Sequence, residues 1–179
     1  MKRDGFSPRF PQVMRRKKHV VGYGVPHDRA RNGLSRFWLC KTRPTKDLVV
    51  FSGPCGAGKS TLANLEFSKR KHTVLLSRDR LRNLRPEFND SDLTKAMIQF
   101  AARWLNAGKS CIIDACNLHE HDRIRWETVA LVCGASLDWR TVGTALDVCI
   151  ERDASRQDPV GAARIREQFA VPVVQELVK

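Results

Sequence analysis

The chain has 179 residues, of which 42% are hydrophobic and 28% are charged, enough material for one folded domain with a core of ordinary size. No apolar run approaches the ~18 residues that a membrane span requires, and no apolar stretch of ~7–15 residues follows the basic N-terminus, so we expect neither a membrane protein nor a cleaved secretory signal. The six cysteines include no C-x-x-C pair, which argues against a zinc ribbon or a redox motif. We expect reduced thiols in a cytoplasmic protein.

The net charge of +13 is concentrated at the N-terminus. Residues 1–46 hold 13 lysines and arginines and only two acidic residues, whereas residues 47–179 hold 19 basic and 17 acidic residues. The first segment scatters prolines, glycines and aromatics among its basic residues and has no helical or alternating apolar period. We therefore expect a basic, largely irregular N-terminal arm over 1–46. Two functions stay open for it: phosphate contacts and base stacking on a nucleic acid, or a solvated or folded-back tail.

Strands and helices alternate in the remainder of the chain, 47–179. We expect the helix over 92–107 to have Ser91 as its N-cap and Gly108 just beyond its end. The helix over 120–133 is expected to bury Ile124 and to end at Gly134. The full set comprises strands at 48–51, 73–76, 111–113 and 135–142, and helices at 60–70, 92–107, 120–133 and 147–154. This alternation predicts an α/β fold, a parallel sheet of four to five strands with helices on both faces and ligands bound beyond the carboxyl ends of the strands.

The first strand runs directly into a glycine-rich motif, GPCGAGKST, which matches G-x-x-x-x-G-K-[ST]. Glycines allow consecutive backbone N–H groups to turn inward around a phosphate. Lys59 is expected to reach the β- and γ-phosphates, and the Ser60 hydroxyl is expected to bind Mg²⁺. The motif predicts a P-loop NTPase-type three-layer sandwich that binds ATP and Mg²⁺ through Gly53, Pro54, Cys55, Gly56, Ala57, Gly58, Lys59, Ser60 and Thr61.

The second strand ends in SRDRLR. Asp79 stands where a carboxylate can face a transferring phosphoryl group and accept a proton from an acceptor hydroxyl. Arg82 lies one helical turn further on and can hold a phosphate of the acceptor. The alternative is that Asp79 is only the N-cap of a short helix whose arginines are solvated.

Two later segments carry further candidates. Asp114 ends the third strand and is either a Walker-B-type ligand of Mg²⁺ through water, an anchor for a nearby cation, or a helix cap; Asn117 is a second candidate for contacting the acceptor. Arg152 and Arg156 are four residues apart on one helical face, and Pro159 breaks that helix soon afterwards. This pattern predicts an arginine lid over ATP, with an exposed basic helix end as the alternative.

From about Leu48 to Phe169, these segments resemble the kinase domain of bacteriophage-type polynucleotide 5′-hydroxyl kinases. The resemblance covers GPCGAGKST, SRDRLR, CIIDACNLHEHDRIRWETVA and CIERDASRQ. The third stretch is the most specific, because an acidic-Asn-Leu segment that leads into an Arg-rich helix with Trp-Glu-Thr is not general P-loop sequence. The family's pattern is altered at Gln157, where it has Gly, and at Pro159-Val160, where its Val-Pro is reversed.

The resemblance implies ATP-dependent phosphorylation of a 5′-OH end of DNA or RNA. It implies that Asp79 is the general base, that Arg82 holds the acceptor's 3′-phosphate and that Asp114 lies near the reaction centre. It also implies that Lys59 and Ser60 handle phosphates and Mg²⁺, and that Arg156 acts from the lid with Arg152 in support. The chain lacks the D-x-D-G-T motif of the family's bifunctional members, so we expect no 3′-phosphatase domain.

Two other functions remain open at this point. One is a P-loop kinase for a small acceptor, namely a nucleoside, nucleotide, sugar or antibiotic; the basic arm argues against it, because a small acceptor has no use for such an excess of positive charge. The other is a nucleic-acid-binding protein with a vestigial nucleotide site, against which the intact Lys59, Ser60, Asp79 and Arg156 argue. The oligomeric state is left open.

Overall fold

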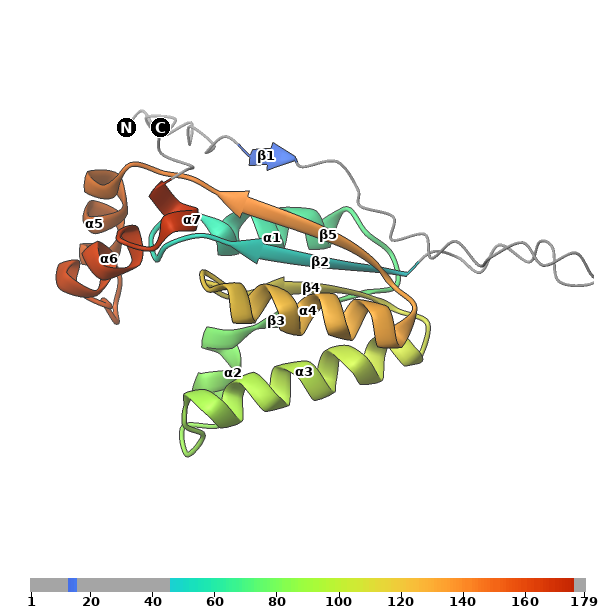
Figure 1. The fold of residues 1–179 in the computed structure, drawn as a ribbon. Coiled ribbons are helices and arrows are strands. Elements are labelled where there is room, and N and C mark those ends of the chain that lie inside the picture. The colour runs from blue at the N-terminus through green and yellow to red at the C-terminus, as the bar shows by residue number, and fades with distance from the viewer. Residues whose placement is uncertain (1–12, 16–45, 176–179) are drawn as a thin grey trace, which may run out of the picture.

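The computed structural model describes residues 13–15 and 46–175 of the chain. Its strands are β1 (Val13–Arg15), β2 (Asp47–Ser52), β3 (Thr73–Ser77), β4 (Ser110–Asp114) and β5 (Ser136–Val142). They form one sheet in the order β1-β5-β2-β4-β3 (Figure 1). The four strands β2 to β5 are parallel, which confirms the predicted parallel sheet, whereas β1 pairs antiparallel with β5 and adds an edge strand.

The strand β1 lies within the segment that the sequence analysis expected to be a largely irregular arm. Val13–Arg15 pairs with Val142, Thr141 and Arg140 of β5. This strand was not predicted, because a three-residue segment is too short to show an alternating pattern. The remaining expectations for residues 1–12 and 16–45 lie outside the described residues.

Seven helices are present in the described part of the chain. The helix predicted at 120–133 is found at these bounds, and those predicted at 60–70, 92–107 and 147–154 are found with shifts of one or two residues at their ends. The last two helices were not predicted. No helix in residues 13–15 and 46–175 is both long enough and apolar enough to cross a membrane. The helices are α1 (Lys59–Ser68), α2 (Arg78–Leu84), α3 (Asp90–Asn106), α4 (Glu120–Cys133), α5 (Leu146–Ala154), α6 (Ala162–Phe169) and α7 (Pro172–Gln175).

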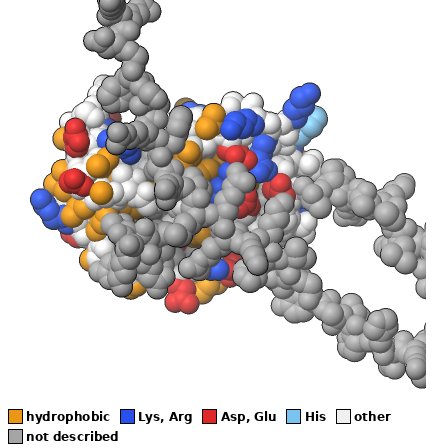
Figure 2. Space-filling view, turned by 90° about the horizontal axis from the view of Figure 1, so that it is seen from above, with side chains coloured by type: hydrophobic (Ala, Val, Ile, Leu, Met, Phe, Trp, Pro, Cys, Tyr) orange, Lys and Arg blue, Asp and Glu red, His pale blue; other side chains and the backbone are white. Residues whose placement is uncertain are grey.

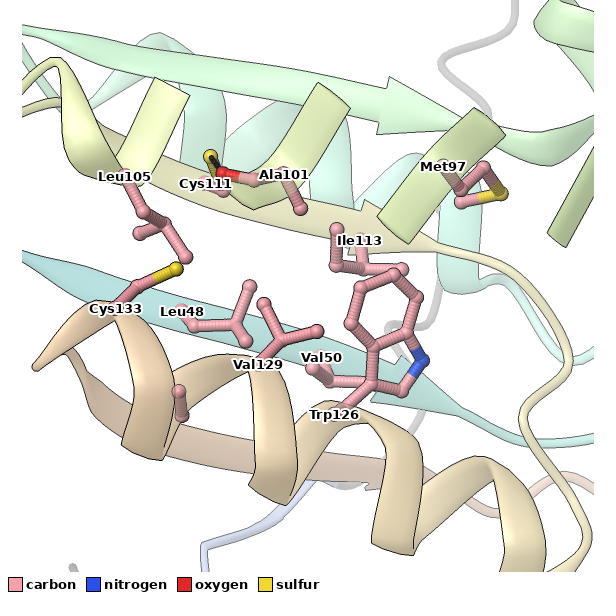
Figure 3. Packing of buried hydrophobic residues seen from close by; sticks show 11 residues of the cluster. Leu48, Val50, Met97, Ala101, Leu105, Cys111, Ile113, Trp126, Val129 and Cys133 are labelled. Atoms are coloured by element: carbon pink, nitrogen blue, oxygen red, sulfur yellow. Dashed lines mark hydrogen bonds between the residues drawn. The ribbon is translucent and has the colours of Figure 1, made fainter. Parts of the chain in front are cut away.

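The sheet has a separate hydrophobic core on each face. Alternate residues of a strand point to opposite faces, so Leu48 and Val50 of β2 pack with α3 and α4, whereas Val49 and Phe51 pack with α1, α5 and α6. Figure 3 shows the first core, where the ring of Trp126 from α4 lies among aliphatic side chains of the sheet. Full burial of each such side chain stabilises the fold by about 1.5–3 kcal/mol. The predicted three-layer sandwich is therefore confirmed.

The ends of two helices show where local reasoning succeeded and failed. Gly134 (φ 61°) closes α4 and Gly108 (φ 80°) follows α3, as predicted. The N-cap of α3 is Asn89, whose side chain accepts a hydrogen bond from the backbone N–H of Asp92, so the assignment to Ser91 was wrong. Ile124 is 55% exposed and does not join the core, because the buried stripe of α4 is narrower than its apolar pattern indicated.

The strand order places a topological switch point beside β2. This strand lies between β4 and β5, and the helices that follow β2 and β4, α1 and α4, pack on opposite faces of the sheet (Figure 1). The chain thus leaves β2 and β4 towards opposite faces, and open α/β sheets bind ligands at such a position. Helices α5 and α6 stand at the same end of the sheet, towards which the arrows of β2 and β5 point.

Candidate functional site

The glycine-rich turn between β2 and α1 is packed tightly against its neighbours. Gly53 (φ 149°) and Gly56 (φ 78°) have backbone conformations that L side chains rarely adopt. A Cβ at Gly53 would lie under 3.0 Å from the carbonyl oxygen of Val142, and one at Gly56 would lie under 3.0 Å from that of Cys149. Both glycines are thus required by geometry, since any side chain would push the turn away from β5 and α5.

Lys59 is buried at the start of α1, inside the turn. Its Nζ donates a hydrogen bond to the carbonyl oxygen of Pro54 (2.7 Å). The first backbone N–H groups of α1 have no partners within the helix, so a buried ammonium group, these N–H groups and the Ser60 hydroxyl converge as donors and ligands for an anion. This set fits the phosphates of a nucleoside triphosphate.

The described residues contain no cluster of three or more His, Cys, Asp or Glu side chains arranged to hold a metal ion. The Ser60 hydroxyl, at the start of α1, is a group that could hold Mg²⁺ at this turn, and nucleotide phosphates and water would have to supply the other ligands. Such a partial protein shell is typical of Mg²⁺ in phosphoryl-transfer sites. The residues present thus fit a metal that arrives with the nucleotide.

Helix α2 carries the predicted acceptor-side residues on the open surface. Asp79 lies in its first turn and Ser77 is the N-cap, so Asp79 does not cap this helix as the alternative required. Arg82 donates to Oδ1 of Asp79 (3.3 Å) and to Oδ1 of Asp90 (2.9 Å). Hydrogen bonds from Arg78 and then from Arg82 hold the pKa of Asp90 below its usual value.

Asp114 and Asn117 follow the same strand but differ in their contacts. Asp114 is buried at the carboxyl end of β4, level with Phe51 of β2 and Ser77 of β3 in the sheet register. Asn117 has a left-handed backbone (φ 46°); its Nδ2 donates to the carbonyl oxygen of Phe51 (2.8 Å), and its Oδ1 accepts from Nε1 of Trp126 (3.1 Å). The side-chain amide of Asn117 thus links β2 to α4 by hydrogen bonds, whereas Asp114 lies at the carboxyl end of β4.

The two predicted lid arginines lie beside the glycine-rich turn. Arg152, in the last turn of α5, approaches the carbonyl oxygen of Gly56 (3.4 Å), and Arg156 pairs with Oδ1 of Asp153 (3.6 Å). Asp153 is almost fully buried, and its Oδ2 accepts a hydrogen bond from the backbone N–H of Gly161 (2.8 Å). Sequence reasoning missed this carboxylate, which holds the two ends of the loop between α5 and α6 together.

A pair of cysteines and a glutamine were also missed. Cys55 Sγ lies 3.5 Å from Cys116 Sγ, and the backbone N–H of Gly53 donates to the carbonyl oxygen of Cys116 (2.9 Å). Gln168 of α6 accepts a hydrogen bond from the backbone N–H of Cys55 (2.7 Å) and donates to its sulfur (3.4 Å). The loops after β2 and β4 and the helix α6 therefore meet at Cys55.

The charges around this cysteine pair show which predicted residues converge. The pKa of Cys55 is lowered to about 6, mainly by the thiol of Cys116, then by Gln168 and by the positive charges of Lys59 and Arg156, against an opposing effect of burial. The pKa of Cys116 is raised, mainly by its hydrogen bond to Cys55 and by burial, with further effects from the charges of Lys59 and Asp79. The charges of Lys59 and Arg156 thus act on Cys55, and those of Lys59 and Asp79 act on Cys116.

Comparisons with solved structures agree with this fold. A chain from the Pnkp1/Rnl/Hen1 RNA repair complex superposes with a TM-score of 0.63 at 20% identity, covering 76% of this chain and 46% of that one. A putative kinase from Chloroflexus aurantiacus gives a TM-score of 0.55 at 22% identity, covering 75% of each chain. The Mycobacterium tuberculosis APS kinase CysC, in complex with AMPPNP and APS, gives 0.51 at 22% identity, covering 63% of this chain and 71% of that one.

These likenesses concern the fold, and the chain spans less than half of the repair-complex chain that it matches. No curated protein sequence matches the chain. A family model described as an AAA domain (AAA_33) matches residues 48–171, which is most of the chain and includes the glycine-rich turn, α2 and both lid arginines. The chain therefore belongs to the AAA_33 family of AAA domains and has the fold of a P-loop kinase.

Proposed function

We propose that the protein transfers the γ-phosphate of ATP to the 5′-hydroxyl end of a DNA or RNA strand. The observation that carries this proposal is the openness of the acceptor side beside a buried phosphate-binding lysine. The side chains of Asp79 and Arg82 are 67% and 46% exposed, whereas Lys59 is buried. An exposed acceptor side suits the end of a long polymer, of which only the terminal nucleotide enters the site.

Cavities in the described residues support a polymer over a small acceptor. The cavity beside α2 that Arg78, Asn117 and Trp126 help to line measures about 10 Å³, which is room for no more than a water molecule. The large cavity, of about 690 Å³, lies between α2 and α3, and neither Asp79 nor Arg82 lines it. Sites for small molecules usually enclose most of the ligand, and Asp79 lines neither of these two cavities.

In the proposed mechanism, each of the predicted site residues has one chemical role. Asp79 accepts the proton of the 5′-hydroxyl as its oxygen bonds to the γ-phosphorus and the bond from that phosphorus to ADP breaks. Lys59 and Arg156 offset the charge that develops on the phosphoryl oxygens, and Arg82 holds a phosphate of the acceptor strand. Ser60, together with the nucleotide phosphates, would hold Mg²⁺, which would supply further charge neutralisation, and Asp114 would orient the ion through water.

Two further observations support nucleic acid as the partner. The repair-complex chain with the same fold belongs to an assembly named for RNA repair. The sequence of residues 1–46 carries 13 basic residues beside a domain of nearly balanced charge, which suits contacts to many phosphates. We propose that residues 1–46 form a nucleic-acid-binding arm and that 47–179 form the kinase domain.

The test is to incubate the full chain with labelled ATP, Mg²⁺ and a panel of 5′-OH DNA and RNA oligonucleotides and free nucleosides. We expect label on the oligonucleotides. Label on the nucleosides alone would identify a kinase for a small acceptor, and label on no acceptor would indicate a vestigial site. Removing residues 1–40 should weaken oligonucleotide binding and flatten its dependence on salt; an unchanged salt slope would show that the arm does not bind nucleic acid.

A further inference from the structure

The contact between Cys55 and Cys116 is unlike the surroundings of the other described cysteines. The thiols of Cys111, Cys133 and Cys149 are buried and face main-chain carbonyl oxygens at 3.8–4.0 Å. Burial raises the pKa of Cys111 to about 12 and that of Cys149 to about 11, so both stay protonated and inert. Cys55 and Cys116 are instead only partly buried, and their sulfurs touch at 3.5 Å.

Cys55 has the surroundings of a nucleophilic thiolate. The sulfur of Cys116 lies within hydrogen-bond distance, and the amide of Gln168 donates to the Cys55 sulfur at 3.4 Å. These two contacts, followed by the charges of Lys59 and Arg156, lower the pKa of Cys55 to about 6 against the opposing effect of burial. A lowered pKa favours the thiolate, the form that attacks an oxidant, and Cys116 stands next to it as the second thiol.

We propose that Cys55 and Cys116 are a modification site, a vicinal dithiol at the phosphate-binding turn that a peroxide oxidises to an intramolecular disulfide. The Cys55 thiolate attacks one oxygen of hydrogen peroxide, the O–O bond breaks, and Cys55 becomes a sulfenic acid as hydroxide takes up a proton and leaves as water. Cys116 then loses its proton and its sulfur bonds to that of Cys55, while the S–O bond breaks and a second water leaves. Two thiols and one peroxide thus give one disulfide and two waters.

The geometry predicts what the disulfide does to the turn. The two sulfurs must approach from 3.5 Å to the bonding distance of about 2.05 Å. Cys116 is held beside β2 because its neighbour Asn117 accepts a hydrogen bond from the Ser52 hydroxyl and donates one to the carbonyl oxygen of Phe51, so much of this movement falls on Cys55. The carbonyl groups on either side of Cys55, those of Pro54 and Gly56, are the acceptors for Lys59 and Arg152. Oxidation therefore displaces the cations that are expected to bind phosphate, a consequence that rests on the proposed function.

The site is tested directly by mapping disulfides. The full chain carrying C40S, which removes the cysteine outside the described residues, is treated with hydrogen peroxide, alkylated and digested for mass spectrometry. We expect a linked peptide pair that contains Cys55 and Cys116, lost after reduction with dithiothreitol. C133S is the matched control and should give the same pair. In C116S, a sulfenic-acid probe should label Cys55 instead. Absence of the Cys55–Cys116 pair, or linkage of other cysteines in its place, would overturn the proposal.

Alkylation kinetics provide a second readout that does not depend on activity. The rate at which iodoacetamide modifies Cys55 should rise with pH around a midpoint near 6. In C116S the midpoint should move up towards the ordinary thiol value of 9.0, because the largest cause of the lowered pKa is removed. A midpoint near 9.0 in both proteins would show that the two thiols are not coupled and would overturn the inference.

Nucleotide binding separates this inference from the proposed function. We expect the oxidised protein to bind ATP at least tenfold more weakly than the reduced protein, measured with a fluorescent ATP analogue. Equal binding by both forms would overturn the regulatory consequence. No binding by the reduced protein would contradict the proposed kinase function, while the mapped disulfide would stand.

Discussion

Two groups of arginines and carboxylates on this molecule differ in burial and in how fully their charged atoms are paired. Between α1 and β5, Arg140 is 9% exposed and pairs with both Glu66 and Asp138 (2.8 Å each), and Arg70 also binds Glu66 (2.6 Å). At the carboxyl end of the sheet, Asp79 and Arg82 are exposed and reach each other only at 3.3 Å. The first group, which we call the closed group, has its charged atoms paired with one another and stabilises the fold. The second group, Asp79 and Arg82, has donors and acceptors left for a ligand.

The surface mixes charges of both signs. Seen from above, acidic and basic side chains are interspersed on the right-hand part of the face, and hydrophobic side chains on the left lie among further acidic and basic ones (Figure 2). Charge alone therefore does not identify the site on this molecule. What distinguishes the two groups is whether each charged atom already has a close, buried partner.

The largest effect is expected from Asp79→Asn, which tests whether the exposed group is catalytic. We expect turnover to fall roughly 10²–10⁴-fold, because the amide cannot accept the proton of the acceptor hydroxyl, while ATP binding and the unfolding midpoint stay as in the parent. Glu127→Gln, on the exposed face of α4, is the matched acid-to-amide control and should keep full activity. An active Asp79→Asn protein would remove this residue from the catalytic machinery.

Replacing Arg140 by Met tests the closed group. Removal of the guanidinium leaves Glu66 and Asp138 partly buried without their shared partner, so the free energy of unfolding should fall by about 3–5 kcal/mol. Turnover per folded molecule should be unchanged. Urea unfolding measures the effect, with Arg123→Met as control, whose exposed pair with Glu127 contributes less than about 1 kcal/mol. Equal stabilities of the two variants would contradict the division.

Acid should weaken the same closed group. Hydrogen bonds from Arg140, followed by those from Arg70, lower the pKa of Glu66 from 4.5 to about 2 in the folded protein. A depressed carboxyl pKa stabilises the fold at pH values above that of the unfolded chain, so this contribution, at most about 3 kcal/mol, should disappear as pH falls from about 5 to 2. Unfolding curves of Glu66→Gln should therefore depend less on pH in this range than those of the parent. Identical slopes would contradict the assignment.

The smallest effect is expected at the acceptor side. Arg82→Ala should raise the KM for the oligonucleotide roughly tenfold and leave kcat within a factor of about three, because the lost contact binds substrate and transition state alike. Arg85→Ala, at the C-cap of the same helix and paired with Glu87, is the control. Steady-state kinetics with a 3′-phosphorylated and an unphosphorylated dinucleotide should show that only the first loses affinity. An unaffected KM would place Arg82 outside the acceptor site.

Local patterns predicted the parts of the fold whose causes are local. Leu48–Phe51 forms a buried strand because each of its residues is apolar, and the glycine-rich motif fixes both the turn and the helix that follows. The end of α4 at Gly134 and the burial of Trp126 also follow from helical spacing. Asn89 as N-cap was missed because Ser91 and Asn89 are chemically equivalent caps, and only the backbone path decides between them.

The unpredicted parts of the site depend on contacts between distant segments. Cys55 and Cys116 are 61 residues apart, and Cys55 and Gln168 are 113 apart, so no spacing rule connects them. Asn117 looked like an acceptor contact because its position follows a strand, yet the packing of α4 against β2 engages its amide. The position of the loop after β4 was predicted correctly, but tertiary packing decides which of its atoms face the glycine-rich turn.

The segment between α5 and α6 is fastened at both sides to a single turn. Arg152, just before it, reaches the carbonyl oxygen of Gly56, and Gln168, at the far end of α6, grips Cys55. These two contacts restrict movement of the segment away from the glycine-rich turn but leave its middle free to rotate about them. If the turn binds a nucleotide as proposed, a shift of the turn would act on both anchors at once, so that nucleotide binding and movement of this segment would be coupled.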